Sequence, residues 1–249
     1  MSPKASFDEQ YKLYSPKSYV QFFLRDLSYR LPFEAMTLLG DYLAQLLETS
    51  TVLETAIVGS CHGLDSAVLK YGYTYDDILK YWLEGDLDDH VFHGGNPMYE
   101  ITMIDINPEP LRFAKHVGLC KGYYRCNMKE ALPKALSFFL EEKVDLLIAV
   151  GITTYLGLEY FQRLVQLVER SQIRFFCFSL PSFIREPYLE IAAQSTLTLK
   201  VLGDVDQRQY NDDDEKTRVL EMLKEQGAYS PRDDSGLVSS ICVAYKTAG

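Results

Sequence analysis

The pattern of apolar and polar positions changes near residue 50 of the chain. Before it, apolar side chains recur at helical spacing, first Val20, Phe23, Leu24 and Leu27, then Met36, Leu39, Tyr42, Leu43 and Leu46. A spacing of three and four residues is typical of a helix with one buried face, and Pro32 favours a boundary between two such helices. The sequence therefore predicts an N-terminal helical cap over residues 1–50.

After residue 50, short apolar segments alternate with helical patterns. Strands are predicted at 56–58, 101–104, 122–125, 144–150, 173–179 and 237–244. Helices are predicted between them at 64–70, 109–117, 131–141, 158–171 and 215–226. Near-continuous apolar strands such as VDLLIAV and IRFFCF are typical of a parallel sheet that helices cover on both faces. We therefore expect one α/β domain with a doubly wound sheet.

Two segments are longer than most loops, 71–99 and 181–214. We expect both at the rim of the sheet, where inserted elements commonly shape a pocket. The single domain, 1–249, is accordingly divided into the cap (1–50), a core (51–180), an insertion on the substrate side (181–214) and a C-terminal helix and strand (215–249).

Composition narrows the class of protein. The 249 residues are 47% hydrophobic and 24% charged, and no apolar run approaches the roughly 18 residues of a membrane span. The N-terminal MSPKASFDEQ lacks a signal layout, and the five scattered cysteines suit reduced thiols, so we predict a cytoplasmic protein. A net charge of −10 without a Lys/Arg cluster disfavours nucleic acid and favours a small-molecule partner; a homodimer is compatible with this composition.

The stretch ETAIVGSCHGLDSAVL is predicted as strand, glycine loop and helix, and its loop has several interpretations. Its G-x-C-x-G core fits a hydrolase elbow with Cys61 as nucleophile, but that arrangement needs a histidine later in the chain, and the last of the four histidines is His116. A dinucleotide loop needs a glycine where Cys61 stands and an acid about 20 residues on, whereas Asp105 lies much farther along.

A third interpretation needs one close backbone approach, a helix start and an acid at the end of the neighbouring strand. ITMIDINPEP supplies that acid, since Asp105 ends an apolar strand at the carboxyl edge of the predicted sheet. A carboxylate there can accept hydrogen bonds from both hydroxyls of a ribose. Asn107 and Pro108 then favour the start of a helix.

These motifs resemble the class I S-adenosylmethionine-dependent methyltransferases. The resemblance covers residues 56–156 in the family's order: strand, glycine loop, strand ending in Asp, polar residue after the third strand, then VDLLIAVGITTYL, which is similar to the fourth-strand motif of small-molecule methyltransferases. It implies a Rossmann-like, mostly parallel sheet of seven strands with helices on both faces, S-adenosylmethionine as cofactor, and methyl transfer to a small-molecule acceptor.

The resemblance also implies site residues. Gly59, Ser60, Cys61 and Gly63 would pack against the methionine part of the cofactor, and Asp105 would hold the ribose. Ile106 would lie on the adenine, with Asn127 and Met128 at its edge, and Val150 and Gly151 would lie beneath the sulfonium. The chain departs from the family at two positions, with Ile57 in place of an acid that ends the first strand and Cys61 in place of a glycine.

Few residues need take part in the chemistry, because an in-line displacement depends mainly on positioning and exclusion of water. Where the acceptor must lose a proton, the candidate bases are His62, Tyr155, Asp204 and Asp206. Tyrosines of the N-terminal segment, Tyr11 and Tyr14 in particular, could close over the cofactor, as in the family. Arg185 and Tyr188 are candidates for contact with the acceptor.

The stretch DLDDHVFHGG raises the question of a metal site, with Asp86, Asp88, Asp89, His90 and His93 close together. Acid-rich loops are mostly solvated, and we predict no metal. Two alternatives to methyl transfer remain open. The fold could bind S-adenosylmethionine for a non-methylating reaction such as a cyclisation, or the chain could be a non-catalytic partner subunit that has lost cofactor binding.

Overall fold

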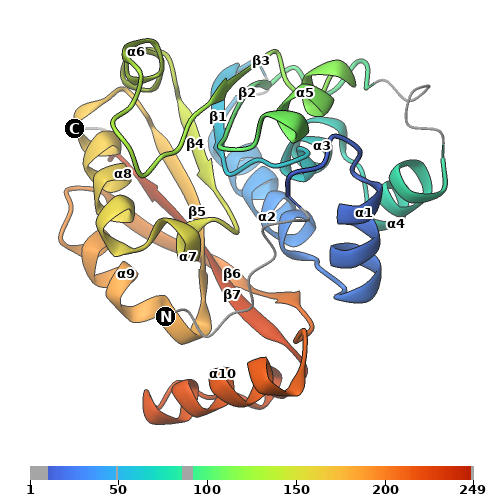
Figure 1. The fold of residues 1–249 in the computed structure, drawn as a ribbon. Helices are drawn as coiled ribbons and strands as arrows, with labels where there is room; N and C mark the ends of the chain where they lie inside the picture. Colours follow the sequence, from blue (N-terminus) through green and yellow to red (C-terminus); the bar gives the residue numbers. More distant parts are fainter. Residues whose placement is uncertain (1–10, 49, 86–91, 248–249) are drawn as a thin grey trace.

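The computed structural model describes residues 11–48, 50–85 and 92–247, which contain one seven-stranded sheet (Figure 1). The strands are β1 (Leu53–Val58), β2 (Tyr99–Asp105), β3 (Gly122–Arg125), β4 (Leu146–Ala149), β5 (Phe175–Pro181), β6 (Thr198–Arg208) and β7 (Leu237–Tyr245). Their order in the sheet is β3-β2-β1-β4-β5-β7-β6. The first five are parallel, and β7 runs antiparallel to both β5 and β6. The predicted doubly wound, mostly parallel α/β sheet is confirmed.

Helices cover both faces of this sheet (Figure 1). The face that carries the N-terminal cap is covered by α1 (Lys17–Tyr19), the π-helix η1 (Val20–Asp26), α2 (Leu31–Leu46), α3 (Leu64–Tyr71), α4 (Tyr75–Ile78), the π-helix η2 (Leu79–Glu84) and α5 (Pro108–His116). The opposite face is covered by α6 (Lys134–Glu142), α8 (Leu158–Arg170) and α9 (Arg185–Ala193). Each strand's side chains alternate between the two cores: Ile57 of β1 lies in the first, and Ala56 and Val58 lie in the second.

The remaining helices lie at the ends of strands. The short α7 (Thr153–Leu156) follows β4, and the 3-10 helix η3 (Ser182–Ile184) follows β5. α10 (Asp213–Glu225) and the 3-10 helix η4 (Pro231–Asp234) join β6 to β7, and a small core of Phe183, Val219, Leu223 and Leu237 holds α10 and η3 to β7. None of the described helices is both long and apolar enough to cross a membrane.

The segment 181–214, in which the sequence analysis assigned no helix or strand, contains α9 and all of β6. β6 is an edge strand with a partner on one side only, and much of it is exposed. Its pairing with β7 shifts register between Val201 and Gly203 and again between Asp206 and Arg208. These shifts interrupt the alternation of apolar and polar residues, which explains why the pattern alone did not reveal a strand.

The other long segment, 71–99, also contains regular structure. α4 begins at a capping box in which Thr74 and Asp77 exchange hydrogen bonds, and η2 continues it. Trp82 of η2 is fully buried, in edge-to-face contact with Phe113 of α5. The regular structure in these two long segments leaves the predicted order of strands β1 to β4 unchanged.

Candidate active site

A cavity of about 410 Å³ lies at the carboxyl ends of β1, β2 and β4. The loop after β1 forms one wall, the residues that follow β2 and β3 form a second, and the turn after β4 forms a third. Tyrosines of the N-terminal cap, Tyr11, Tyr19 and Tyr29, close the remaining side. Ligands of open α/β sheets bind outside the carboxyl ends of the strands, where the strand order reverses, and here β1 lies between β2 and β4 at that point.

The loop after β1 turns sharply through three residues with positive φ: Gly59 (70°), Cys61 (45°) and Gly63 (88°). A Cβ atom at Gly59 would lie 2.7 Å from Cγ1 of Ile152, so a glycine is needed for the close approach of the turn after β4. A Cβ atom at Gly63 would lie 2.6 Å from Cε of Met103 on β2. Gly63 does not line the cavity; it allows the start of α3 to pack against the sheet.

Asp105, at the end of β2, holds this loop in place. Its Oδ2 accepts a hydrogen bond from the backbone N–H of Cys61 at 2.9 Å, and its Oδ1 accepts one from the N–H of Asn107 at 2.9 Å. Burial raises the pKa of the Asp105 carboxyl, and these backbone donors oppose the rise. The carboxylate lines the cavity and keeps lone pairs that can accept two ligand hydroxyls.

The wall beyond Asp105 presents an apolar side chain and an amide. Ile106 is 52% exposed and lines the cavity together with Asn127 and Met128. The amide of Asn127 is fixed at both ends, because Nδ2 donates to Glu130 at 2.9 Å and Oδ1 accepts from the N–H of Lys129 at 3.1 Å. This wall can hold a flat ring against Ile106.

His62 lines the cavity with both ring nitrogens in polar contacts. Nε2 lies 2.8 Å from the carbonyl oxygen of Leu13, so Nε2 carries the proton, and Nδ1 is left to accept the proton of the Cys61 thiol at 3.2 Å. Burial lowers the pKa of His62 to about 4, and burial also raises the pKa of the Cys61 thiol. At neutral pH this pair is an uncharged thiol and an uncharged imidazole, which favours a role for His62 in fixing the backbone at Leu13 to the glycine loop.

Aromatic rings of the cap meet Tyr155 of α7 at the cavity. The ring of Tyr11 lies 5.3 Å from that of Phe23 and 6.4 Å from that of Tyr155, centroid to centroid. Burial raises the pKa of Tyr11 and Tyr19, so both keep their phenolic protons at neutral pH.

Comparison with solved structures places this arrangement among known folds. The CurJ carbon methyltransferase superposes with a TM-score of 0.52 at 9% identity, covering 87% of this chain and 54% of that one. Magnesium protoporphyrin IX methyltransferase (ChlM) from Synechocystis PCC 6803, with bound SAM, gives a TM-score of 0.50 at 12% identity, covering 92% and 84%. The bifunctional kinase-methyltransferase WbdD gives 0.50 at 12% identity, and this chain spans 38% of its length.

The chain has the class I S-adenosylmethionine-dependent methyltransferase fold. No protein-family model matches it, and no curated protein has a matching sequence. At identities near one in ten, the likeness establishes the methyltransferase fold and leaves the acceptor open.

Most of the predicted site residues surround one cavity of this methyltransferase fold. Eleven of the thirteen line it: Gly59, Ser60, Cys61, His62, Asp105, Ile106, Asn127, Met128, Val150, Gly151 and Tyr155. Gly63 lies behind the loop, as described above. Tyr14 does not line the cavity. It is 38% exposed, and its ring lies edge-to-face with that of Phe113 at 5.8 Å, so of Tyr11 and Tyr14 it is Tyr11 that reaches the cavity.

Four further candidates lie away from the cavity. Asp204 accepts a hydrogen bond from the Ser240 hydroxyl at 2.6 Å, and Asp206 pairs with Arg232 at 2.6 Å. The remaining two lie on α9: the Tyr188 hydroxyl donates to the carbonyl of Thr153 at 3.2 Å, and Arg185 pairs with Glu186. None of the four lines the cavity among the described residues.

The stretch considered for a metal lies mainly outside the described residues, since Asp86, Asp88, Asp89 and His90 fall in 86–91. Within the described ranges no group of three or more His, Cys, Asp or Glu side chains is arranged to hold a metal ion.

The structure adds cavity residues that the sequence analysis did not assign, chiefly Tyr29 and Asp65. Tyr29 lies in the linker between η1 and α2, where nothing in the local pattern points to a site. The end of β6 holds this linker, because the N–H of Arg30 donates to the carbonyl of Gln207 at 2.9 Å and the N–H of Gln209 donates to the carbonyl of Leu27 at 2.8 Å.

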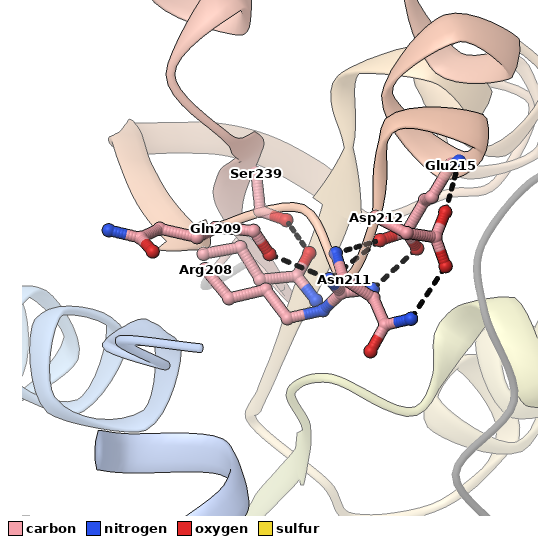
Figure 2. Close-up of polar contacts among 7 residues, drawn as sticks. Arg208, Gln209, Asn211, Asp212, Glu215 and Ser239 are labelled. Atoms are coloured by element: carbon pink, nitrogen blue, oxygen red, sulfur yellow. Dashed lines mark hydrogen bonds and ion pairs between the residues drawn. The ribbon is translucent and has the colours of Figure 1, made fainter. Parts of the chain in front are cut away.

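A buried ion pair fixes that end of β6 (Figure 2). The guanidinium of Arg208 contacts both carboxylate oxygens of Glu215 at 2.6 and 2.9 Å, with both side chains at most 1% exposed. Figure 2 also shows Asp212, which caps α10 by accepting from the N–H of Glu215 at 2.7 Å, and Ser239 of β7, whose hydroxyl donates to Gln207 at 2.8 Å. The network therefore positions Tyr29 from the far edge of the sheet.

Proposed function

We propose that this protein transfers the methyl group of S-adenosylmethionine to a small-molecule acceptor. The observation that carries the proposal is the cavity at the carboxyl ends of β1, β2 and β4, which brings together the glycine loop and Asp105. Its volume of about 410 Å³ falls in the usual range for small-molecule sites, roughly 300 to 1,000 Å³.

Each wall of the cavity suits one part of the cofactor. Asp105 would accept hydrogen bonds from the ribose hydroxyls, while Ile106, Asn127 and Met128 would hold the adenine. The loop residues Gly59, Ser60 and Cys61 would lie along the methionine part, with Val150 and Gly151 near the sulfur. Two carboxylates, Asp65 and Asp105, line the cavity against one lysine, Lys129, a balance that favours a cationic ligand.

S-adenosylmethionine, when bound, supplies a methyl carbon activated by the positive sulfur. The chain's own part is to orient the acceptor and exclude water. Four tyrosines line the cavity, and their hydroxyl groups can orient an acceptor: Tyr11, Tyr19, Tyr29 and Tyr155. His62 and Tyr155 stay our candidates for catalytic residues; both nitrogens of His62 are already in contacts with Leu13 and Cys61.

A small acceptor is favoured because the cap covers the cavity and the chain carries a net charge of −10. A duplex or single strand of nucleic acid would meet this negative charge at every phosphate. A cytoplasmic location and a homodimer remain compatible with this activity.

Titration calorimetry with S-adenosylmethionine and, separately, S-adenosylhomocysteine tests the proposal. Micromolar binding of either supports a working cofactor site; no binding to folded protein would contradict it and favour a non-catalytic partner subunit. Mass analysis of reactions with candidate acceptors then separates methyl transfer, which adds a methyl group to the product, from a non-methylating reaction. The non-methylating reaction is included in this test because Cys61 stands where the family has a glycine.

A further inference from the structure

Asp65 is a buried carboxylate that lines the cavity without a full set of partners. It is the second residue of α3, directly after the glycine loop, and it is only 6% exposed. Its Oδ1 accepts no hydrogen bond from any residue in the described part of the chain. A buried polar atom without a partner is costly, and such atoms are commonly completed by a ligand.

The other carboxylate of the cavity differs in this respect. Both oxygens of Asp105 accept backbone N–H groups, from Cys61 and Asn107. Burial raises the pKa of Asp65 to about 7, and only its own backbone N–H works against that rise. Backbone N–H groups therefore hydrogen-bond both oxygens of Asp105, whereas one oxygen of Asp65 has no donor among the described residues.

Asp65 lies near two tyrosines of the cap that line the same cavity. Its charge is close enough to the hydroxyls of Tyr19 and Tyr29 to raise the pKa of both. The hydroxyl of Tyr29 in turn lies against Gly151, where an added Cβ would be 2.8 Å away. This is the end at which the proposed function places the methionine part.

We propose that Asp65 binds the protonated α-amino group at the amino-acid end of S-adenosylmethionine. The inference rests on the proposed function and deepens it by assigning the residue that holds this charge. In the family an acid at the end of the first strand would be available, but here Ile57 stands at that position, 1% exposed and within the core. The carboxylate is thus supplied by the first turn of α3 and not by β1.

Ser60 supports the same assignment. Its hydroxyl is buried, lines the cavity and has no hydrogen-bond partner among the described residues. A hydroxyl can donate to a carboxylate and a carboxylate can accept from an ammonium, so Ser60 and Asp65 together match the two charges of a free amino acid group.

The test compares two nucleosides by titration calorimetry at pH 7.5. S-adenosylhomocysteine carries the amino-acid end, and 5′-methylthioadenosine lacks it. Asp65→Asn should weaken the binding of S-adenosylhomocysteine about 10- to 100-fold, as expected for a lost hydrogen bond between charged groups, and should leave 5′-methylthioadenosine within about twofold. Asp214→Asn, which removes the same charge from the exposed start of α10, is the matched control and should change neither.

The outcomes separate the two proposals. Wild-type protein that binds neither nucleoside removes the proposed function and this assignment with it. Wild-type binding that Asp65→Asn leaves intact, or weakens equally for both nucleosides, removes only the assignment to Asp65. If Asp65→Asn does not fold, the wild type is titrated with the deaminated analogue of S-adenosylhomocysteine; binding at least about tenfold weaker supports the assignment, and equal binding overturns it.

Discussion

The backbone N–H of Cys61 donates to the carboxylate of Asp105 across 44 residues of sequence, at 2.9 Å. This bond joins the loop after β1 to the end of β2 and orders both sides of the cavity before any ligand arrives. Because Cys61 is a non-glycine residue with positive φ, the loop conformation depends on such external support.

Removing that carboxylate should weaken nucleoside binding. We expect Asp105→Ala to reduce the affinity for S-adenosylmethionine by about 1 to 3 kcal/mol, through lost charge-assisted bonds to the ribose. Titration calorimetry measures the change, with Asp214→Asn as the charge-matched control. Unchanged affinity would remove Asp105 from the site.

The backbone strain at Cys61 can be measured by two substitutions. Cys61→Gly and Cys61→Ala both remove the thiol that contacts His62, but only glycine adopts the left-handed conformation without cost. We expect the glycine variant to be more stable than the alanine variant by about 1 kcal/mol, the reverse of the order in an ordinary helix or strand. Urea denaturation gives both free energies of unfolding, and an alanine variant as stable as the glycine variant would show that the loop is not strained there.

Stability of the ligand-free protein should depend on pH through Asp65. Its pKa rises from the ordinary 3.8 to about 7, so the folded state holds the proton more tightly than the unfolded chain does. The stabilisation from this proton is complete below about pH 4 and is lost as pH rises to 7, at up to about 1.4 kcal/mol per pH unit.

Asp65→Asn keeps the shape of the protonated side chain and has no charge to bury. We therefore expect the variant to gain stability over the wild type progressively from pH 5 to pH 7, with little further change to pH 8. Thermal unfolding across this range measures the difference, and a constant offset at all pH values would contradict the assignment of the titration to Asp65.

The buried Arg208–Glu215 pair should matter far more than an exposed one. Glu215→Ala leaves the guanidinium buried without its partner and should cost about 3 to 5 kcal/mol of unfolding free energy. Arg232→Ala breaks the exposed pair with Asp206 and should cost at most about 1 kcal/mol. Chemical denaturation of both variants gives the comparison, and equal losses would mean that the buried pair does not hold β6 and α10 together.

The sequence alone predicted those elements whose local pattern of apolar residues matches their burial in the folded protein. Strands β1, β2, β4 and β5 are mostly apolar runs buried on both faces, and the segment that begins at Asp105 ends a strand and starts a helix in a few residues. The pattern was insufficient for β6, whose exposed edge and two register shifts remove the period of two. It was also insufficient for Tyr29, because a partner distant in sequence, the end of β6, sets its position.

Asp65 shows a different limit. An acid two residues past a glycine loop and at the start of a helix is expected to be solvated and to favour the positive end of the helix dipole. In the folded protein Asp65 is buried, and Tyr19 and Tyr29 of the cap lie close enough for its charge to raise the pKa of both. These neighbours come from a distant part of the sequence, so the local pattern does not reveal them.

The hydrogen bonds between the Leu27–Arg30 linker and the end of β6 also bear on the order in which the protein is completed during synthesis. A ribosome releases the cap before the glycine loop and Asp105, and it releases the anchor at Gln207 and Gln209 later than both. A nascent chain that stops short of β6 can pair β1 with β2 but lacks the two backbone hydrogen bonds that hold the linker on either side of Tyr29. The finished binding site therefore depends on β6, and fragments that end before β6 should not be expected to retain it.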